Sequence, residues 1–337
     1  MTILFLTRLF HPHIGGVETH VFQISKRLID GSHRIVVLTE KNEYKLHNKE
    51  SVDGIEIYRI PVGKNEWFKK FQIWWWLWNH RFLIKKADII HCHDVFFWYL
   101  PFRFLFFNKP AYTTFHGYES YPVSKKAITI RKISEILSWG NICIGDYIKK
   151  WYGTKPTHVS YGGVDISSSH RSFKNKYSAV FIGRLDEQTG ILTYTDAVEI
   201  IKKKIPNFDF LAIGDGELKN KISRKVKIYE ALDNASDYFQ KYNFAFVSRY
   251  LSILEAMAAK RLVFAVYDNP LKEDYLRITP CASYMIICLT SDELASQVLY
   301  YLKHSKEEKV KIDQAYKWVK KQTWENVISL YLKLWNK

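Results

Sequence analysis

Short apolar runs alternate with longer amphipathic segments along the chain, and this alternation restarts in the second half. Runs of this length predict strands that are buried on both faces, as in a parallel sheet. In the first half we expect strands at Ile3–Thr7, Arg34–Thr39, Ile55–Ile60, Asp88–His91, Ala111–Phe115, Asn141–Ile144 and Val159–Tyr161. In the second half we expect strands at Ala179–Ile182, Phe208–Ile213, Phe244–Val247, Leu262–Tyr267 and Tyr284–Leu289.

The amphipathic segments between these runs predict helices, most clearly at Glu18–Ile29 and Trp67–Lys86 and again from 307 to the end. Strands that alternate with helices are typical of the α/β class, and two such series indicate two doubly wound, Rossmann-like domains facing across a cleft. The serine-rich, charged segment 165–176 is the best linker candidate. We therefore predict a first domain over 1–165 and a second over 166–315.

The formal net charge of +16 adds an expectation about partners. A surplus of this size attracts nucleic acid, acidic lipid or phosphorylated small molecules. Four cysteines without a C-x-x-C pair indicate reduced, buried thiols of a cytosolic protein. Met1–Arg8 reads as a strand rather than a signal peptide, and no apolar run reaches the length of about 18 residues that a membrane span needs.

Glu255 is a single carboxylate in an otherwise apolar stretch, Leu251–Ala259, with Ser252 as a plausible helix start. A Glu surrounded by Leu, Ile, Ala and Met is seldom buried without a partner. That partner could be a pair of ligand hydroxyls, which one carboxylate can accept together. The alternative is a solvent-exposed helix Glu.

Glycine-containing corners follow three of the predicted strands. Gly183-Arg184 follows one strand, Gly214-Asp215-Gly216 the next, and Gly15-Gly16 joins the first strand to the first helix. Glycine allows close backbone approach to a ligand, and an adjacent Arg can bind phosphate oxygens in a fork. Taken one at a time, each corner is equally well explained as a tight turn.

Five motifs in order give the chain a recognisable pattern: Gly15-Gly16-Val17-Glu18, Phe115-His116-Gly117, Tyr161-Gly162-Gly163-Val164-Asp165, Gly183-Arg184-Leu185 and Leu254-Glu255-Ala256-Met257-Ala258. With Gln322-Thr323-Trp324-Glu325 before the last helix, the chain resembles glycosyltransferase family 4. The family consists of retaining, nucleotide-sugar-dependent enzymes of the GT-B fold. The resemblance implies that fold for this chain, with a last helix in 316–337 packing toward the first domain.

The resemblance also implies roles for individual residues. His116 would lie beside the transferred sugar, Arg184 would bind the donor diphosphate, and Glu255 would bind the ribose hydroxyls. His116 and Arg184 are the catalytic candidates, and the expected donor-binding residues are Gly15, Gly16, Gly183, Arg184, Gly214, Leu254 and Glu255. The family needs no bound metal or other cofactor, because cations and a helix N-terminus neutralise the leaving diphosphate.

The chain departs from the family pattern at two charges. Thr189 and Gly190 stand where the family has its second diphosphate cation, a lysine. Val247 stands where the family has a Glu that contacts the donor sugar, and Ser248-Arg249-Tyr250 replaces the following Gly-Phe-Gly. Arg249, Lys260 or Arg261 could compensate, with a solvated surface cation as the alternative for each.

The segment Trp67–Trp78 mixes aromatic and basic residues. Trp67, Phe71, Trp74, Trp75, Trp78 and Phe82 fall on one helical stripe, which we expect to pack on the sheet. Phe68, Trp76 and Leu77 lie outside that stripe, beside lysines that suit an anionic membrane surface. The predicted membrane surface is Trp67, Lys69, Lys70 and Trp76. An ordinary core helix with a basic rim is the alternative, and stacking on nucleic acid is a third interpretation, which no recognised nucleic-acid module in the sequence supports.

Alternation along a strand puts His91 and His93 of His91-Cys92-His93-Asp94 on one side. With no complementary ligand cluster in the sequence, a polar cluster at the strand end is favoured over a metal site.

Together these patterns and the resemblance predict a cytoplasmic glycosyltransferase that acts with retention and can lie on the inner face of the cytoplasmic membrane. It would move a sugar, of the hexosyl type, from a nucleoside-diphosphate sugar to a hydroxyl of a glycan or lipid-linked glycan. The missing family charges motivate an alternative, a degenerate homologue that binds a glycan or a partner protein.

Overall fold

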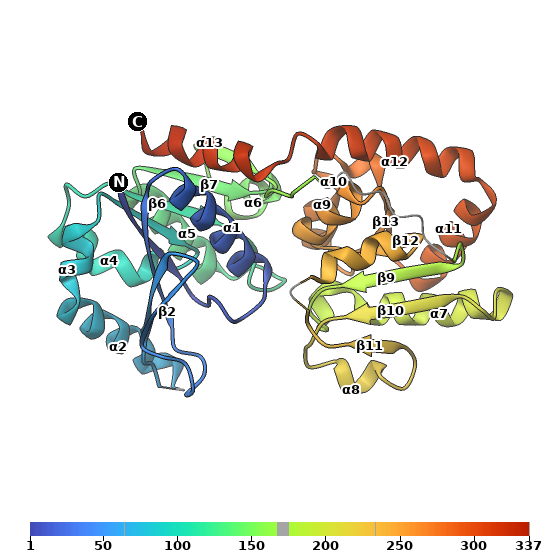
Figure 1. The fold of residues 1–337 in the computed structure, drawn as a ribbon, viewed down its shortest axis with the longest axis horizontal. Coiled ribbons are helices and arrows are strands. Elements are labelled where there is room, and N and C mark those ends of the chain that lie inside the picture. The colour runs from blue at the N-terminus through green and yellow to red at the C-terminus, as the bar shows by residue number, and fades with distance from the viewer. Residues whose placement is uncertain (64, 167–174, 233, 337) are drawn as a thin grey trace. The chain divides into compact units, whose positions relative to one another are not determined.

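The computed structural model describes residues 1–63, 65–166, 175–232 and 234–336, so most of the predicted linker at 165–176 lies outside them. The chain divides into two compact units (Figure 1). Unit 1 contains Met1–Ser160 and the residues from Trp324 onward, and unit 2 contains Tyr161–Thr323. The predicted limits at 165 and 316 differ from these, because a parallel β-bridge joins Val164 to Thr323 and both residues belong to unit 2.

Unit 1 is built on an eight-stranded sheet in the order β3-β4-β2-β1-β5-β6-β7-β8. Its strands are parallel except for β3 and β4, which form an antiparallel pair at one edge. The strands are β1 (Thr2–Thr7), β2 (Arg34–Glu40), β3 (Lys49–Val52), β4 (Ile55–Ile60), β5 (Ile89–His93), β6 (Ala111–Phe115), β7 (Gly140–Ile144) and β8 (His158–Ser160). From β1 the sheet grows first toward β2 and β4 and then, beginning with β5, toward the other edge, which makes β1/β5 its switch point.

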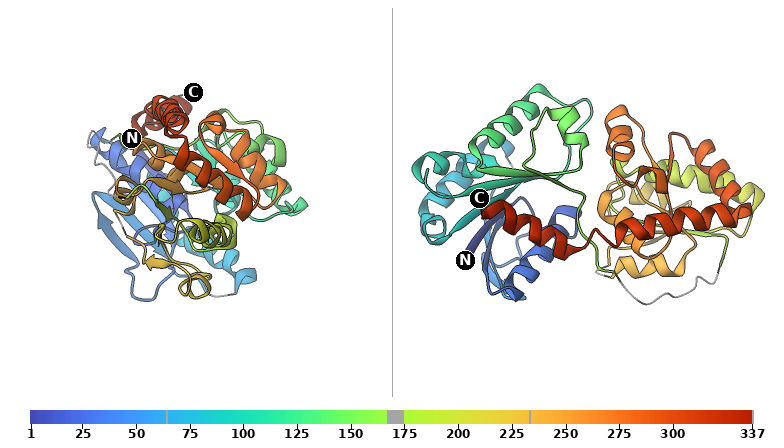
Figure 2. Two further views of the ribbon diagram at one scale, coloured as in Figure 1. Left: turned by 90° about the vertical axis from the view of Figure 1, so that its right-hand side faces the viewer. Right: turned by 90° about the horizontal axis from the view of Figure 1, so that it is seen from above.

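The helices of unit 1 cover both faces of this sheet (Figure 1). They are α1 (Gly16–Asp30), α2 (Glu66–Asn79), α3 (Arg81–Lys86), α4 (Phe96–Leu105), α5 (Lys125–Leu137), α6 (Tyr147–Tyr152) and α13 (Trp324–Trp335). Although α13 is last in the chain, it packs on α1 and contacts β8, as the right view of Figure 2 shows for the red and blue helices. The helix at the end of the chain thus completes the core of unit 1.

Unit 2 is built on six parallel strands in the order β11-β10-β9-β12-β13-β14. The strands are β9 (Ser178–Ile182), β10 (Asp209–Ile213), β11 (Lys227–Tyr229), β12 (Phe244–Phe246), β13 (Leu262–Val266) and β14 (Ile286–Cys288). The helices are α7 (Ile191–Lys204), α8 (Lys219–Ile222), α9 (Tyr250–Ala258), α10 (Pro270–Arg277), α11 (Ser291–Lys303) and α12 (Ser305–Val319), with short 3₁₀ turns η1 (Glu187–Thr189), η2 (Ala235–Lys241) and η3 (Ala282–Tyr284). In order of appearance the strands run 3-2-1-4-5-6, the arrangement of a Rossmann sheet.

The predicted α/β class with two parallel-sheet domains is confirmed, and each predicted strand overlaps a strand of the structure. Two strands were not predicted: β3 and β11, which lie at sheet edges. The predicted helix Trp67–Lys86 is two helices, because the chain leaves the helical conformation at His80, whose ring stacks on Trp76 at 3.7 Å.

The aromatic helix α2 presents the opposite face to the one predicted. Ile73, Trp76 and Leu77 are buried in the core of unit 1. The predicted core stripe is largely exposed, with Trp75 at 71% and Trp67 at 65%. Trp74 of that stripe is half-buried, and its indole N–H donates to the Phe97 carbonyl. A helix that is aromatic on several sides has two plausible buried stripes, and here the one with the aliphatic residues is buried.

Candidate functional site

The switch point of unit 2 lies between β9 and β12, the two strands from which its sheet grows in opposite directions. Ligands of open parallel sheets bind beyond the carboxyl ends of the strands at such a point. The loop Gly183–Gly190 follows β9, and the segment Val247–Arg249 follows β12. Arg249 donates to the Gln188 side chain at 2.7 Å, so these two segments touch.

Two of the glycine corners lie backbone to backbone. The Gly183 N–H donates to the Ile213 carbonyl at 3.1 Å, and the Leu185 N–H donates to the Asp215 carbonyl at 2.9 Å. A Cβ at Gly214 would stand 1.9 Å from the Gly183 oxygen, and φ there is +151°. No side chain fits at Gly214. This corner is therefore a tight turn, as the alternative interpretation had it, and it also packs directly against the main chain that follows β9.

Thr189, which stands where the family has a lysine, holds the loop after β9 together. Its hydroxyl donates to the carbonyls of Arg184 and Asp186, each at 2.8 Å, and its N–H donates to the Asp186 carboxylate at 3.0 Å. The side chain is 3% exposed. Arg184 extends outward instead, with 59% of its side chain exposed and Asp186 at 3.1 Å. Arg184 is therefore available to an anionic ligand beside this fixed loop.

The segment after β12 is also fixed by internal contacts. Val247, at the family's other charged position, is buried in the sheet. The Ser248 hydroxyl contacts the Tyr194 hydroxyl at 2.6 Å and accepts the Val266 N–H at 2.9 Å. The Tyr250 ring stacks on Tyr275 at 4.0 Å. A carboxylate in place of Val247 would lie in this apolar interior and not at its surface.

Of the three cations predicted to compensate, Arg249 alone is joined to the loop that carries Arg184 by a described contact. Lys260 lies over the Tyr316 ring at 4.4 Å. Arg261 is buried, donates to the Phe239 carbonyl at 2.8 Å, and has a pKa that burial lowers to about 10. These contacts tie Lys260 to α12 and Arg261 to η2.

A cation that the sequence did not point to, Lys272, lies behind the same site. Its side chain is 1% exposed on α10, and its ammonium donates to the Ser248 carbonyl and lies 4.4 Å from the Tyr275 ring centre. Burial, followed by repulsion from Arg249, holds the pKa of Lys272 well below its ordinary value. The helix start Asn269-Pro270 was the one local signal, since the Asn269 side chain caps the Lys272 N–H.

Glu255 lies on α9, which starts directly behind the β9 loop. The Ser252 hydroxyl donates to the Ile182 carbonyl at 3.1 Å, and this contact joins α9 to the end of β9. Burial raises the pKa of the Glu255 carboxyl to about 7. Within the described part of the chain, no hydrogen bond or ion pair to that carboxylate is found. Its neighbour Leu254 is buried and packs near Gly162, so Leu254 is a packing residue of α9.

The corresponding switch point of unit 1 carries the predicted Gly15-Gly16 corner. Gly15 precedes α1 with extended backbone, and Gly16 is its first residue. A Cβ at Gly16 would meet no atom of the described structure within 4 Å, and neither would one at Gly117. These two positions leave open space beside the amino end of α1 and beside His116.

His116 is the half-buried member of a group of histidines that lies at β5, the end of β6 and α1. Its Nε2 lies 2.9 Å from Nδ1 of His93, and its ring lies 4.8 Å from that of His20. His91 shares the side of β5 with His93, as predicted, and contacts Thr114 and Trp335. Burial is the main cause that lowers the pKa of each of these histidines, to about 3 for His20 and His91. All four are neutral at physiological pH.

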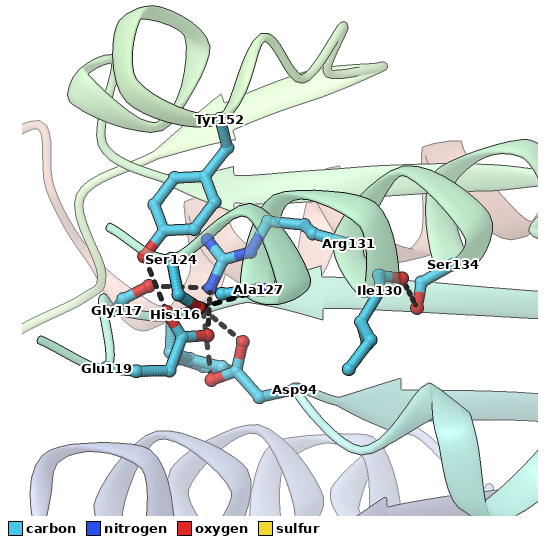
Figure 3. Close-up of polar contacts among 10 residues, drawn as sticks. All are labelled: Asp94, His116, Gly117, Glu119, Ser124, Ala127, Ile130, Arg131, Ser134 and Tyr152. Atoms are coloured by element: carbon cyan, nitrogen blue, oxygen red, sulfur yellow. Dashed lines mark hydrogen bonds and ion pairs between the residues drawn. The ribbon is translucent and has the colours of Figure 1, made fainter. Parts of the chain in front are cut away.

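The backbone of His116 is fixed by a charged network in which Asp94 belongs to the predicted polar cluster, whereas Arg131, Glu119 and Tyr152 were not predicted (Figure 3). Asp94, which has φ +60°, accepts the His116 N–H at 3.0 Å. Arg131 on α5 donates to the Gly117 carbonyl at 2.8 Å and to Glu119 at 3.1 Å. Tyr152 lies under the Arg131 guanidinium at 3.8 Å and donates to Glu119. Burial raises the pKa of Asp94 to about 6, although Arg131 and the His116 N–H favour its ionised form.

Among the described residues, no group of three His, Cys, Asp or Glu side chains is arranged to hold a metal ion. No helix within that part of the chain is both long and apolar enough to cross a bilayer.

The second domain thus brings Gly183, Arg184, Gly214 and Glu255 together around the end of β9, and the first brings His116 beside Gly117 and Asp94. Residues 14–168 match the model of Glycosyltransferase Family 4, and residues 176–303 match that of the group 1 glycosyl transferases. The chain belongs to glycosyltransferase family 4.

Curated relatives of this family 4 chain share part of its length. It is 21% identical to the GPI3 subunit of phosphatidylinositol N-acetylglucosaminyltransferase from Saccharomyces cerevisiae, over 64% of this chain and 53% of the subunit. It is 28% identical to an uncharacterized glycosyltransferase from Methanocaldococcus jannaschii, over 65% and 61%. A Campylobacter jejuni N-acetylgalactosaminyltransferase named for an undecaprenol-linked glycan is 24% identical, over 63% and 62%. The matches thus span less than two thirds of each of these relatives.

Solved structures share the fold of this family 4 chain over its full length. Sucrose-phosphate synthase from Thermosynechococcus elongatus has a TM-score of 0.77 at 14% identity, covering 99% of this chain and 98% of the enzyme. HepE from Anabaena, solved with UDP, has a TM-score of 0.71 at 14% identity, covering 99% of each chain. Both likenesses show the GT-B fold.

Proposed function

We propose that this family 4 chain transfers a sugar, of the hexosyl type, from a nucleoside-diphosphate sugar to a hydroxyl of a glycan or lipid-linked glycan, with retention of configuration. The observation that carries the proposal is Glu255, a carboxylate of raised pKa with no described partner, on the helix behind the Gly183-Arg184 corner. A pair of ribose hydroxyls would supply the hydrogen bonds that this carboxylate lacks.

The diphosphate end of the donor would be bound by cations of the protein. Arg184 is exposed beside the loop, and Arg249 reaches the same loop through Gln188. Lys272, whose ammonium contacts the Ser248 carbonyl, adds positive charge behind this site when it is protonated. Fixed cations at a departing diphosphate lower the barrier to transfer because they need no reorganisation during the reaction. We propose that they act without a metal or other cofactor.

The acceptor would bind in unit 1. A pocket of about 230 Å³ lies at the ends of β1, β2 and β5 and beside α2 and α4, and it is lined by Arg8, Glu40, Lys69, Lys70, Ile73, Asp94, Val95, Phe97 and Trp98. A lining that combines charged groups with aromatic rings suits a sugar, which has both hydroxyls and an apolar ring face. The names of the yeast and Campylobacter relatives, which refer to phosphatidylinositol and undecaprenol, support a lipid-linked acceptor.

The test is transfer by the purified protein from a panel of UDP-, GDP- and ADP-linked sugars to a lipid-linked glycan, with the anomeric configuration of the product read by NMR. Arg184→Ala should lower kcat about 100-fold or more, as loss of a charge-stabilising donor does. Glu255→Ala should weaken nucleotide binding by about tenfold. Arg224→Ala and Glu199→Ala, both at exposed positions of unit 2, are the matched controls. Unchanged transfer by Arg184→Ala and Glu255→Ala would refute the assignment, and an inverted product would refute retention.

A degenerate, glycan-binding or partner-binding homologue is the second candidate. It is favoured by Thr189 and Val247, both of which are built into the packing where the family has charges. Calorimetry separates the two candidates, because the degenerate homologue should show no heat of binding with any of the three nucleotide-sugar classes.

We also propose that unit 1 contacts an anionic membrane from the cytoplasmic side. The predicted surface changes, because Trp76 is buried and Lys69 pairs with Glu40 at 2.6 Å. Trp67 and Lys70 remain, and the exposed aromatic surface of α2 and α3 is completed by Phe68, Phe71, Trp75, Trp78 and Phe82. Lys70, Arg81 and Lys86 lie over rings of this surface at 4.9 to 5.8 Å. Rings beside cations suit the headgroup layer of anionic lipid.

Flotation with vesicles tests this surface. The protein should float with vesicles containing phosphatidylglycerol, less with pure phosphatidylcholine, and less again at high salt. Trp75→Ala with Trp78→Ala should abolish flotation. Tyr44→Ala removes an even more exposed ring elsewhere in unit 1 and should have no effect. Equal flotation of both variants would place the contact outside α2.

A further inference from the structure

The ring of His116 is held through one nitrogen. Its Nε2 is 2.9 Å from Nδ1 of His93, and this leaves Nδ1 of His116 for a ligand. The ring is partly exposed, and the open space at Gly117 lies beside it. His93 is buried, with the Phe5 ring at 5.2 Å and the His91 ring at 5.0 Å. One imidazole is therefore internal and the other faces outward.

The two rings share one hydrogen bond, and its proton belongs either to Nδ1 of His93 or to Nε2 of His116. Burial holds the pKa of both His93 and His116 well below the ordinary value, so each ring is neutral and carries one N–H. In one arrangement His93 donates from Nδ1 to Nε2 of His116. In the other, His116 donates from Nε2 to Nδ1 of His93. The two arrangements leave opposite groups on the outward nitrogen of His116, an N–H in the first and a lone pair in the second.

The far nitrogen of His93 distinguishes them. Its Nε2 is buried and has no hydrogen-bond partner among the described residues. If His116 donated, the proton of neutral His93 would sit on this Nε2 as a buried N–H without an acceptor. If His93 donates, only a lone pair is left unpaired there. Buried orphan N–H groups are rarer than unpaired acceptors, so the second situation is favoured.

We propose that His93 is a positioning residue, which donates to Nε2 of His116 and so fixes His116 in the tautomer that carries its proton on Nδ1. His116 then offers a hydrogen-bond donor at its open side. It can stabilise an oxygen of the sugar or of the departing phosphate, but its outward nitrogen cannot accept a proton as a base. The chemical role of this donor rests on the proposed function, whereas the tautomer does not.

Contacts of the backbone and of a third ring keep His116 in place. Asp94 accepts its N–H, and the His20 ring meets it edge-on at 81°. His20 is itself bound at 3.0 Å to the hydroxyl of Tyr331 on α13. The imidazole therefore meets His93 in a fixed orientation.

NMR of protein labelled with ¹⁵N in histidine tests the tautomer directly, without substrate. Long-range proton–nitrogen spectra near pH 7.5 should show for His116 a protonated-type shift at Nδ1 and an unprotonated-type shift at Nε2. His93 should show the same pattern. A protonated Nε2 on His116 in the unaltered protein would overturn the proposal, whatever its activity.

His93→Phe removes the donor and keeps a ring of similar size. The two nitrogen shifts of His116 should then move toward each other, because neither tautomer is fixed. Thr114→Val is the matched control: it removes a buried hydroxyl bound to His91 and Tyr331, but not to His93 or His116, and should leave the shifts unchanged. Unchanged His116 shifts in a folded His93→Phe protein would also overturn the proposal.

Activity gives a second readout if the protein transfers sugar. His93→Phe should lower kcat by about 10- to 100-fold while the KM for the nucleotide sugar changes less than about twofold, because the altered donor acts in the transition state. A protein that shows the predicted shifts but transfers no sugar would refute the proposed function alone. An unchanged kcat in an active enzyme would refute the role of the donor.

Discussion

The raised pKa of Glu255 makes the stability of the protein depend on pH. Its pKa of about 7 lies above the ordinary value of 4.5, so the folded protein holds a proton that the unfolded chain has lost between these values. The free energy of unfolding should therefore fall as pH rises from about 4.5 to 7 and level off above 7. Ligand hydroxyls donate to the ionised carboxylate, so a bound nucleotide should lower this pKa and release protons.

Calorimetry of nucleotide binding at pH 7, in two buffers of different ionisation enthalpy, should detect this proton release. Glu255→Gln should abolish the release and should also flatten the pH dependence of unfolding between pH 5 and 7. The same proton release in Glu255→Gln would assign the titration to another group, such as Asp94 in unit 1.

Thr189 shows why a missing family charge is not restored by one substitution. We expect Thr189→Lys to lower the free energy of unfolding by about 2 to 4 kcal/mol, because it removes two hydroxyl hydrogen bonds and buries a charge. Urea denaturation measures the loss, and Glu187→Lys, exposed in the same turn, is the control. Faster transfer by a fully stable Thr189→Lys protein would show instead that the position is open to the diphosphate.

The residues of the site divide into those that local sequence reveals and those that it does not. The glycine corners and Glu255 stand out because neighbouring residues already make them unusual. Lys272 and Arg131 do not, because each gains its meaning from contacts with distant segments, Ser248 and Gly117 respectively. Likewise the pairing of His93 with His116 depends on the register of β5 against β6, which no motif encodes.

At the scale of elements, the sequence predicted the strands that are buried on both faces, but it did not predict two partly exposed strands at the sheet edges. β3 reads Lys-Glu-Ser-Val, with its residues alternately exposed and half-buried, and β11 reads Lys-Ile-Tyr. Each pairs with a single neighbour at a sheet edge, so neither carries the apolar run that identified the central strands. The buried face of helix α2 was predicted wrongly for the opposite reason, because apolar residues occupy more than one of its faces.

Two neighbouring tryptophans of α2 should therefore differ sharply in stability. Trp76→Ala should cost about 3 to 5 kcal/mol, because it leaves a cavity in the core of unit 1. Trp75→Ala should change stability by less than about 0.5 kcal/mol, because its ring is 71% exposed. Chemical denaturation of both proteins measures the difference, and equal costs would mean that the other stripe faces the core.

At the scale of the whole molecule, each unit has its own sheet and core, but unit 1 is formed by two separate segments of the chain, one before unit 2 and one after it. The second segment, α13, contributes Tyr331 and Trp335 to the buried histidine group. Contacts with α1, including Arg27 with Glu325 at 3.2 Å, extend along the helix. The amino-terminal unit therefore depends on residues that follow the whole of unit 2.

Removal of residues 324–337 should expose the histidine group and destabilise unit 1, while unit 2 keeps its core. Hydrogen exchange followed by mass spectrometry should show lost protection in α1, β5 and β6 and unchanged protection in β9 and β13. Lys333→Ala, at an exposed position of α13, should leave both units protected. Uniform loss of protection across both sheets would contradict this division of the core.

The close approach of the Gly183 main chain limits which residue can stand at position 214. At Thr189 and Val247, where the family has charged side chains, the residues present are buried in the surrounding packing. A single methyl group at Gly214 would overlap the neighbouring main-chain oxygen, which no other substitution nearby can move aside. Position 214 is thus restricted to glycine by the path of the main chain itself, whatever ligand the loop after β9 binds.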